Sequence, residues 1–317
     1  MKSTTLAGLT LASGMLLAYA CGGGSTQGPT PVPQPTATPN LPAIMTAGDI
    51  SCDSATPQLA CKSRETSDLI VSERALRPAV LTLPLGDLQY DSGTLAEFRR
   101  NYHATWGRLN PISRPAPGNH EYETRNASGY FDYFVGEGVN VGLRTEGWYS
   151  YDFAEWHFVA LNSNCDRIGG CQAGSPQYQW LQADLALSRR KCTVAYMHHP
   201  LVSTGLNGNA PTVLPLMRLL YTNRTEIVLT GHDHNYERFV PMTPDLVPDA
   251  VTGLRLFVVG TGGRDLQSFA RATIHIVAFR TNEHFGVLRI VMRGESYDWS
   301  FVNIGGTVID AGTGECF

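Results

Sequence analysis

Strand-like apolar runs in this sequence repeatedly end in side chains that can bind metal ions. The five segments concerned are "GDIS", "GDLQY", "PGNHE", "MHHP" and "GHDH", which begin at residues 48, 86, 117, 197 and 231. In α/β sheets, the loops that leave the carboxyl ends of the strands converge on one rim. Any fold of this chain should therefore bring together Asp49, Asp87, Asn119, His120, His198, His199, His232 and His234.

Each segment alone has an ordinary explanation. A Gly-Asp pair after a strand is usually a turn or a helix cap, and a single histidine is more often packed or exposed than a ligand. The combination is informative, because independent turns have no reason to end five strands with oxygen and imidazole donors only. Such a set fits two metal ions, since one carboxylate can bridge two cations while imidazoles and an amide oxygen complete their coordination.

Between these segments the chain alternates apolar runs with helical patterns. Strands are expected at 43–50, 79–88, 156–163, 193–198, 226–231 and 254–260, and helices at 65–78, 94–109, 175–191 and 211–224. This alternation predicts an α/β architecture with buried, largely parallel strands. The stretch 285–310 alternates with turns and predicts an antiparallel meander.

The N-terminal residues read as an export signal followed by a tether. Residues 1–20 combine an early lysine with an apolar run, which is typical of a signal peptide. Cys21 follows directly and resembles the lipid-bearing cysteine of a bacterial lipoprotein, although simple secretion stays open. The Pro/Thr/Gly-rich stretch up to residue 40 predicts a linker, and residues 41–317 a single catalytic domain.

Charge and cysteine content narrow the possible partners. The net charge of -4 gives no electrostatic reason to expect nucleic acid or an anionic membrane surface. The membrane is therefore expected as a partner only through a lipid on Cys21. The remaining six of the seven cysteines suggest disulfides in an exported chain. Proximity favours one of several possible pairings, Cys52–Cys61, Cys165–Cys171 and Cys192–Cys316.

In order and spacing, the five segments resemble the motifs of the calcineurin-like metallophosphoesterases. The pattern "GDLQY" together with "GHDHNYER" is similar to purple acid phosphatases and their bacterial relatives. The resemblance implies an α/β fold of two facing mixed β-sheets flanked by helices, a four-layer sandwich.

The resemblance also implies a role for each candidate residue. A trivalent iron would be held by Asp49, Asp87, Tyr90 and His234. A second ion, zinc, manganese or divalent iron, would be held by Asp87, Asn119, His198 and His232. His120 would protonate the leaving oxygen, and His199 is the candidate to assist it.

Tyr90 decides which metal this arrangement can hold. Its phenol has an ordinary pKa of about 10 and must lose its proton to become a ligand. A trivalent iron could bring this about, whereas magnesium or calcium would not. The sequence therefore predicts iron at the Tyr90 position and a coloured protein.

Some positions depart from the family pattern or keep two interpretations. The first block has Ser51 where the family usually has glycine or alanine, and the segment 201–211 lacks the outer histidines of the plant enzymes. An optimum near neutral pH or above is expected for that reason. Glu121, Tyr236 and Arg238 are expected to orient loops. Arg264 either contacts a phosphate or lies on the surface.

The predicted function is hydrolysis of small phosphomonoesters outside the cytoplasm by attack of metal-bound hydroxide. A phosphodiesterase or nucleotidase using the same metals is the alternative within the enzyme class. A surface lipoprotein that only binds, with a vestigial site, is the alternative outside it.

Overall fold

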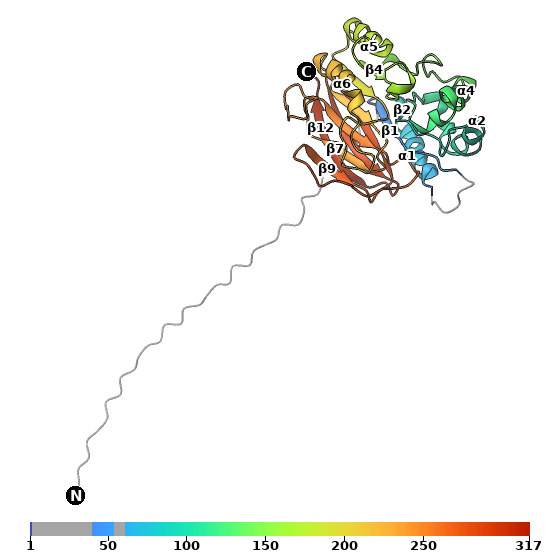
Figure 1. The fold of residues 1–317 in the computed structure, drawn as a ribbon. Coiled ribbons are helices and arrows are strands. Elements are labelled where there is room, and N and C mark those ends of the chain that lie inside the picture. The colour runs from blue at the N-terminus through green and yellow to red at the C-terminus, as the bar shows by residue number, and fades with distance from the viewer. Residues whose placement is uncertain (2–39, 54–60) are drawn as a thin grey trace. The chain divides into compact units, whose positions relative to one another are not determined.

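The computed structural model describes residues 40–53 and 61–317, together with Met1 (Figure 1). The fold below is that of the unit Pro33–Phe317. The predicted signal peptide, the lipid-anchor cysteine Cys21 and the linker lie, apart from Met1 and Asn40, outside the described residues.

One sheet has five strands in the order β12-β11-β10-β1-β2. Strands β1 and β2 are parallel, with Ala43 paired to Val80, and the other neighbours are antiparallel. The last three strands form the meander expected from the sequence. The bounds are β1 (Ala43–Ala47), β2 (Val80–Pro84), β10 (Gly286–Arg293), β11 (Ser296–Asn303) and β12 (Val308–Glu315).

The other sheet has seven strands in the order β3-β4-β5-β6-β8-β7-β9. Its centre, β4-β5-β6-β8, is parallel, and β3, β7 and β9 join it in antiparallel pairs. The bounds are β3 (Tyr149–Phe153), β4 (Trp156–Ala160), β5 (Cys192–Tyr196), β6 (Ile227–Thr230), β7 (Tyr236–Phe239), β8 (Arg255–Val259) and β9 (Val277–Thr281).

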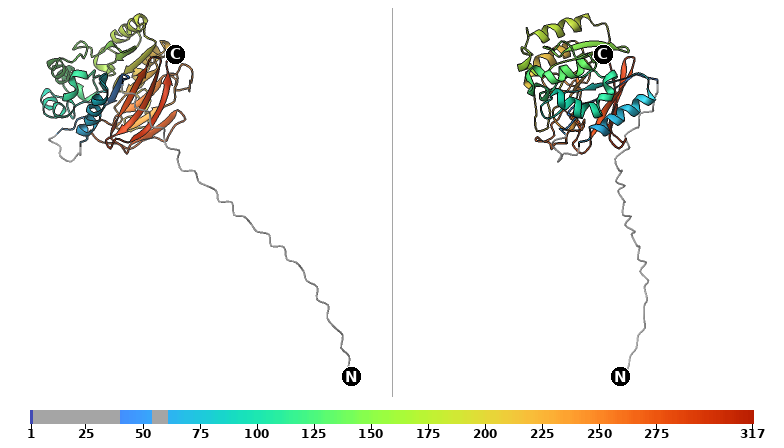
Figure 2. Two further views of the ribbon diagram at one scale, coloured as in Figure 1. Left: turned by 180° about the vertical axis from the view of Figure 1, so that it is seen from behind. Right: turned by 90° about the vertical axis from the view of Figure 1, so that its right-hand side faces the viewer.

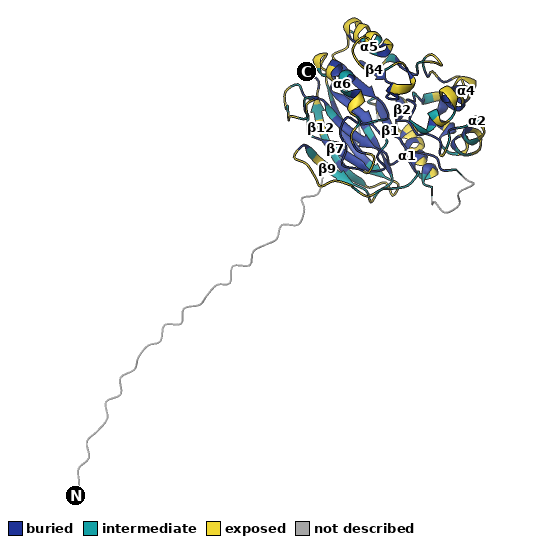
Figure 3. Ribbon diagram, in the orientation of Figure 1, coloured by how far each residue is buried: buried dark blue, intermediate teal, exposed yellow. Residues whose placement is uncertain are grey.

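The central strands of the seven-stranded sheet are buried on both faces, and alternate residues enter two different cores (Figure 3). One set packs with residues of the five-stranded sheet: Phe158, Val194, Leu229 and Phe257. The other set packs with α5 and α6: Val159, Ala195, Val228 and Leu256. Because side chains of a strand point alternately to opposite faces, this division shows that the sheets face each other and helices cover the outer side.

The helices lie outside the sheets, as the two views of Figure 2 also show. Helices α5 and α6 cover the seven-stranded sheet, and α1 packs against β2 and β10. The α-helices are α1 (Ser63–Leu76), α2 (Leu95–Glu97), α3 (His103–Thr105), α4 (Ser128–Gly136), α5 (Pro176–Leu187) and α6 (Leu214–Thr222). The π-helix is η1 (Phe98–Tyr102), and the 3-10 helices are η2 (Gly107–Ile112), η3 (His120–Glu123), η4 (Arg125–Ala127), η5 (Cys165–Arg167) and η6 (Pro211–Val213).

The expected fold class, two facing mixed sheets flanked by helices, is confirmed. All six predicted strands are present, and the predicted helix at 94–109 is divided among α2, η1, α3 and part of η2. Strands β3, β7 and β9 and helix α4 were not anticipated. None of the helices in the described part of the chain is long and apolar enough to span a membrane.

Three disulfides join the cysteines in the pairs that proximity favours: Cys52–Cys61, Cys165–Cys171 and Cys192–Cys316. The third closes a sequence separation of 124 residues. It links the first residue of β5 to the residue after β12, and so fastens one sheet to the other.

His157 connects the edge of the seven-stranded sheet to α5. Its Nδ1 lies 2.9 Å from the Asp152 carboxylate on β3, and its Nε2 lies 2.8 Å from the Asp184 carboxylate on α5. Burial lowers the pKa of His157, but the carboxylates of Asp184 and Asp152 raise it by more, so that it lies above the ordinary 6.5. A charged imidazole can donate to both carboxylates at once, whereas a neutral one donates to only one.

This pairing predicts a pH-dependent contribution to stability. A folded-state pKa above the unfolded value gives stabilisation that is complete below the unfolded pKa and disappears as the pH rises through the folded one. His157→Gln should lower the free energy of unfolding by about 1–3 kcal/mol near pH 6, and by less at alkaline pH. Urea denaturation at both pH values measures this loss. His103→Gln is the control, because His103 Nδ1 bonds to the uncharged Tyr133 hydroxyl and not to a carboxylate. An equal loss at both pH values would contradict the prediction.

Candidate metal centre

The loops that follow β1 and β2 continue side by side beyond the sheet. The Asp49 amide donates to the Gly86 carbonyl at 3.1 Å, and the Ile50 amide donates to the Asp87 carbonyl at 3.0 Å. The Tyr90 amide donates back to the Ser51 carbonyl at 2.9 Å. The parallel pairing of the two strands therefore places Asp49, Asp87 and Tyr90 next to one another.

Three of the candidate ligands have left-handed backbone conformations. The φ angles are 60° at Asp49, 51° at Asp87 and 71° at His232. Non-glycine residues adopt this region at a cost of about 1–2 kcal/mol each, and such outliers cluster at functional sites. The turns direct the side chains toward one another at the strand ends.

Two glycines are required where the loops approach most closely. A Cβ atom on Gly118 would lie 2.2 Å from an oxygen of Asp87. A Cβ on Gly86, whose φ is +80°, would lie 2.7 Å from the His198 ring. The glycines of "GDLQY" and "GNHE" therefore allow Asp87 and His198 to come together.

One group of donors surrounds the Tyr90 hydroxyl. This oxygen lies 2.8 Å from Asp49 Oδ1, 3.1 Å from Asp87 Oδ2 and 3.0 Å from His234 Nε2. A phenol carries one hydrogen, so it can donate to only one of these three atoms.

A second group surrounds His198 Nε2. This nitrogen lies 3.1 Å from Asn119 Oδ1, 3.1 Å from His232 Nδ1 and 3.2 Å from Asp87 Oδ2. Asp87 therefore takes part in both groups. Its side chain is 2% exposed, so water does not compete for its charge.

Neighbouring acceptors orient the two central imidazoles. His198 Nδ1 lies 2.8 Å from the Leu85 carbonyl, and His234 Nδ1 lies 2.7 Å from the Asp265 carboxylate. A nitrogen that donates to such an acceptor leaves the lone pair of the other nitrogen free for a metal ion. Lone pairs of nitrogen and oxygen thus converge at two adjacent points, a donor set that fits two cations with Asp87 between them.

The electrostatics of the site favour positive charge. Burial lowers the pKa of His198, but Asp87 raises it by more, to about 9. Burial also lowers the pKa of His234, and Asp49 and Asp265 raise it to about 10. The carboxylates therefore attract protons strongly, and they would attract metal ions for the same reason.

Tyr90 and His232 respond in the opposite direction. Burial and the carboxylates of Asp49 and Asp87 hold the pKa of the Tyr90 phenol well above 10. Burial and His198 lower the pKa of His232 to about 4, so that its imidazole stays neutral and able to coordinate. A phenolate at Tyr90 accordingly requires a strong cation at the first donor group.

His120 and His199 border the two donor groups, and a ring nitrogen of His199 lies within 4.8 Å of ring nitrogens of His198 and His232. The His120 amide donates to Asp87 Oδ1 at 2.8 Å, its Nδ1 contacts the Asp91 carbonyl, and its ring centroid is 4.2 Å from that of Tyr90. The His199 ring centroid is 4.4 Å from that of His232. Its Nδ1 lies 2.8 Å from the Ser163 hydroxyl. The nine sequence-predicted site residues are thus all brought to one rim.

Several supporting residues could not be found from the sequence. Asp265 and Ser163 orient His234 and His199, and neither was singled out as a site residue from the sequence. Glu121 is fully buried and accepts the amides of Asp87, Leu88 and Gly118 at 2.7–2.9 Å, which is the loop-orienting role expected for it.

Two other sequence candidates lie away from the site. Tyr236 and Arg238 both bond to Asp310 of β12.

A depression in the surface opens onto the donor groups. Its lining residues are Asp87, Tyr90, Asn119, His120, Asn207, His232, His234, Arg264, Asp265 and Gln267. A second depression shares Asn119 with the first and is lined also by Tyr122, Ser163, Asp166, Arg167 and His199. A small substrate could therefore reach the donors from solvent.

Comparison with known proteins finds phosphoesterases, among them a nucleotide pyrophosphatase/phosphodiesterase of Hordeum vulgare that is 24% identical over 258 residues, which cover 70% of this chain and 67% of that protein. The family model for calcineurin-like phosphoesterases matches residues 61–236. An uncharacterized protein of Mycobacterium tuberculosis is 29% identical over 238 residues, which cover 66% of this chain and 43% of that protein. Purple acid phosphatase 22 of Arabidopsis thaliana is 31% identical over 243 residues, which cover 70% of this chain and 53% of that protein.

A solved structure shares the fold. The purple acid phosphatase from yellow lupin (Lupinus luteus) seeds matches with a TM-score of 0.73 at 19% identity, over 86% of this chain and 53% of that one. The chain spans about half the length of the curated relatives it matches. These matches confirm the resemblance that the five motifs carry.

The position of Glu121 predicts how the site depends on it. In Glu121→Gln an amide nitrogen would face backbone amides, and each unsatisfied buried donor costs about 1–3 kcal/mol. We expect a lower melting temperature and a roughly ten- to hundredfold loss of metal affinity, measured by thermal unfolding and competition with a chelator. Glu123→Gln, an exposed change on the same turn, is the control. Wild-type metal affinity in Glu121→Gln would refute this dependence.

Proposed function

The chain belongs to the calcineurin-like phosphoesterase family, and on that premise we propose that it hydrolyses phosphate monoesters at a centre of two metal ions. The observation that carries the proposal is the convergence of two buried donor groups that share Asp87. A pair of adjacent cations suits displacement at phosphorus, where both the attacking and the leaving oxygen need stabilisation.

We assign the ligands by the two donor groups. The first ion would be held by Asp49, Asp87, Tyr90 and His234, and the second by Asp87, Asn119, His198 and His232. The distances of 2.8–3.3 Å among these atoms support the assignment. Bound there, the ions would supply an activated water and neutralise the charge of the phosphoryl oxygens.

The two outer histidines would handle the leaving group. His120 Nδ1 is engaged by the Asp91 carbonyl, which leaves Nε2, 3.9 Å from Asp87 Oδ2, to carry a proton toward the leaving oxygen. The Ser163 hydroxyl accepts the His199 amide at 2.9 Å and can donate to His199 Nδ1. His199 would then carry its single hydrogen on Nε2 and donate a hydrogen bond from there to the ester oxygen.

We propose trivalent iron at the Tyr90 position, with zinc, manganese or divalent iron at the other. The phenol is flanked by two carboxylates that oppose its ionisation, so only a strongly acidic cation would make it a ligand. The purple acid phosphatases among the relatives point to the same choice.

We also propose that the protein acts outside the cytoplasm. Three disulfides support this setting, because such bonds persist in oxidising compartments. Attachment through a lipid on Cys21, with secretion as the alternative, remains part of the proposal.

The function is tested with two chromogenic esters. Metal-loaded protein should hydrolyse p-nitrophenyl phosphate faster than bis(p-nitrophenyl) phosphate. Asp87→Asn should lose at least about a hundredfold in kcat/KM, because it weakens both ions at once. Asp245→Asn, which changes an exposed carboxylate, is the control. Preference for the bis ester would favour a phosphodiesterase, and equal activity of Asp87→Asn and wild type would exclude this site.

The metal is tested with Tyr90→Phe. Wild type should contain iron and show a visible absorption band from phenolate coordination. The variant should remain folded and lose the band, since the ring still fills its place while the oxygen is gone. Elemental analysis and the visible spectrum of both proteins decide the matter. An active wild type that is colourless and free of iron would support the phosphatase activity and refute the assignment of iron.

A further inference from the structure

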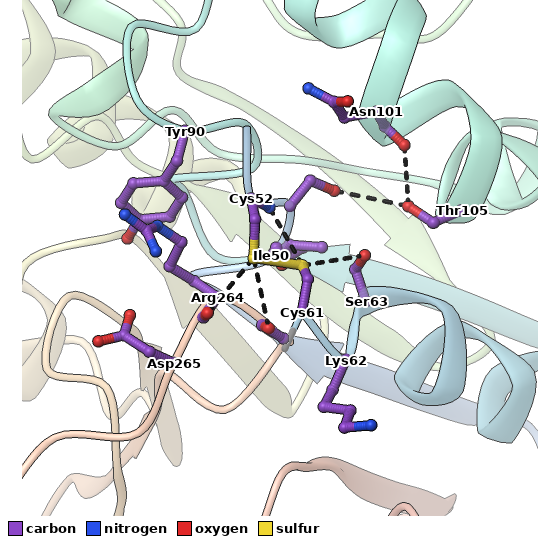
Figure 4. The surroundings of a disulfide bond; sticks show 12 residues. Ile50, Cys52, Cys61, Lys62, Ser63, Tyr90, Asn101, Thr105, Arg264 and Asp265 are labelled. Carbon is purple, nitrogen blue, oxygen red and sulfur yellow. Dashed lines mark hydrogen bonds between the residues drawn. A yellow bond between two sulfur atoms is a disulfide. The ribbon is translucent and has the colours of Figure 1, made fainter. Parts of the chain in front are cut away.

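Arg264 lies between the Cys52–Cys61 disulfide and Tyr90, one of the candidate ligands (Figure 4). Its amide donates to the Asp49 carbonyl at 2.9 Å, and its carbonyl oxygen lies 3.3 Å from Cys52 Sγ of the Cys52–Cys61 disulfide. The adjacent Gly263 carbonyl accepts the Lys62 amide at 2.8 Å, just before α1. The backbone of Arg264 is therefore fixed by a candidate ligand on one side and by the disulfide on the other.

The guanidinium of Arg264 lies over Tyr90 and is not a surface group. Its Cζ is 4.9 Å from the Tyr90 ring centroid, and the side chain is only 15% exposed. Nη2 lies 3.0 Å from the Asp91 carboxylate. Nε is buried and has no hydrogen-bond partner in the described part of the chain. This arrangement decides against the surface position that the sequence left open.

Arg264 places a positive charge in the depression over the donor groups. Among the described residues that line the depression over the donor groups, Arg264 is the one Lys or Arg, and the same lining includes the carboxylates of Asp87 and Asp265. Its Asp91 partner is half exposed, at 52%, so that ion pair is screened by solvent and contributes little by itself. The Arg264 guanidinium, which lines the depression and is largely buried, can therefore bind a second anion in addition to the Asp91 carboxylate.

We infer that Arg264 binds a phosphoryl oxygen of the substrate and thereby favours the dianionic monoester over the monoanionic diester. The inference rests on the proposed function and names the substrate class of that site. A guanidinium presents several N–H donors in a plane that matches the oxygens of a phosphate. The Tyr90 ring, whose centroid is 4.9 Å from Cζ, limits the positions of this plane, so little rotamer entropy is lost when an anion binds.

The discrimination follows from charge. A phosphate monoester has a second pKa of about 6 and carries close to two negative charges at neutral pH, whereas a diester carries one. A diester also has only two terminal oxygens, whereas a monoester has three. A fixed cation in a partly desolvated depression therefore stabilises the monoester more.

The test compares three variants with wild type. Arg264→Met removes the cation and keeps the length of the side chain. Asp91→Asn removes the partner carboxylate and keeps the guanidinium. Arg218→Met removes an arginine from an exposed ion pair with Asp245 and is the matched control. For each metal-loaded protein, kcat/KM is measured on p-nitrophenyl phosphate and its bis ester, the affinity for inorganic phosphate by calorimetry, and the metal content by elemental analysis.

Arg264→Met should bind phosphate roughly ten- to a hundredfold more weakly, with unchanged metal content. Its kcat/KM for the monoester should fall by a similar factor, and by less for the diester. Asp91→Asn should bind phosphate as tightly as wild type or more tightly, and Arg218→Met should match wild type.

Two results would overturn the inference. One is wild-type phosphate affinity and ester preference in Arg264→Met. The other is the same defect in Asp91→Asn, which would mean that Arg264 only holds the Asp91 loop. Failure of the proposed function has a different signature, a metal-loaded wild type that hydrolyses neither ester, and the calorimetric comparison would then still decide whether Arg264 binds phosphate.

Discussion

The buried carboxylate of Asp87 is the constraint on which the rest of the site depends. One oxygen accepts the His120 amide, and the other lies 3.1 Å from the Tyr90 hydroxyl and 3.2 Å from His198 Nε2. Burial raises the pKa of Asp87, but His198 and His120 lower it by more. The pKa therefore lies below its ordinary value, and the group is charged in the folded protein. A buried charge of this kind is costly unless it is paired, and the surrounding cationic and hydrogen-bonding groups offset that cost.

The position of Asp87 is in turn set by the backbone. The parallel pairing of β1 and β2 continues to the Tyr90 amide, and Glu121 holds the amides of Asp87 and Gly118 in one carboxylate. Burial and the nearby Asp87 charge raise the pKa of Glu121 to about 7. The chain therefore places a second carboxyl group close to the first, and stabilises it with the amides of Asp87, Leu88 and Gly118.

The sequence was sufficient to predict which side chains follow the strand ends. It was insufficient to predict the residues that orient those side chains. The convergence of Asp49, Asp87, Asn119, His198 and His232 could be predicted because motif order and strand periodicity are local signals. Asp265 could not, because its contact with His234 depends on where a loop after β8 returns in space. The same reason applies to β7, whose sequence "YERF" has no alternation of its own and is buried by partners on both sides. The disulfide pairs were accessible only because two of them close short loops.

Tyr90 contacts the candidate metal ligands with its oxygen, and His120 and Arg264 with its ring. Its oxygen faces Asp49 and His234, while its ring carries His120 at 4.2 Å and the guanidinium of Arg264 at 4.9 Å. A phenylalanine at this position would keep the ring contacts and lose only the oxygen. If both proposals hold, metal identity and substrate contact can be separated at this residue, because the first would depend on one atom and the second on the face of a ring.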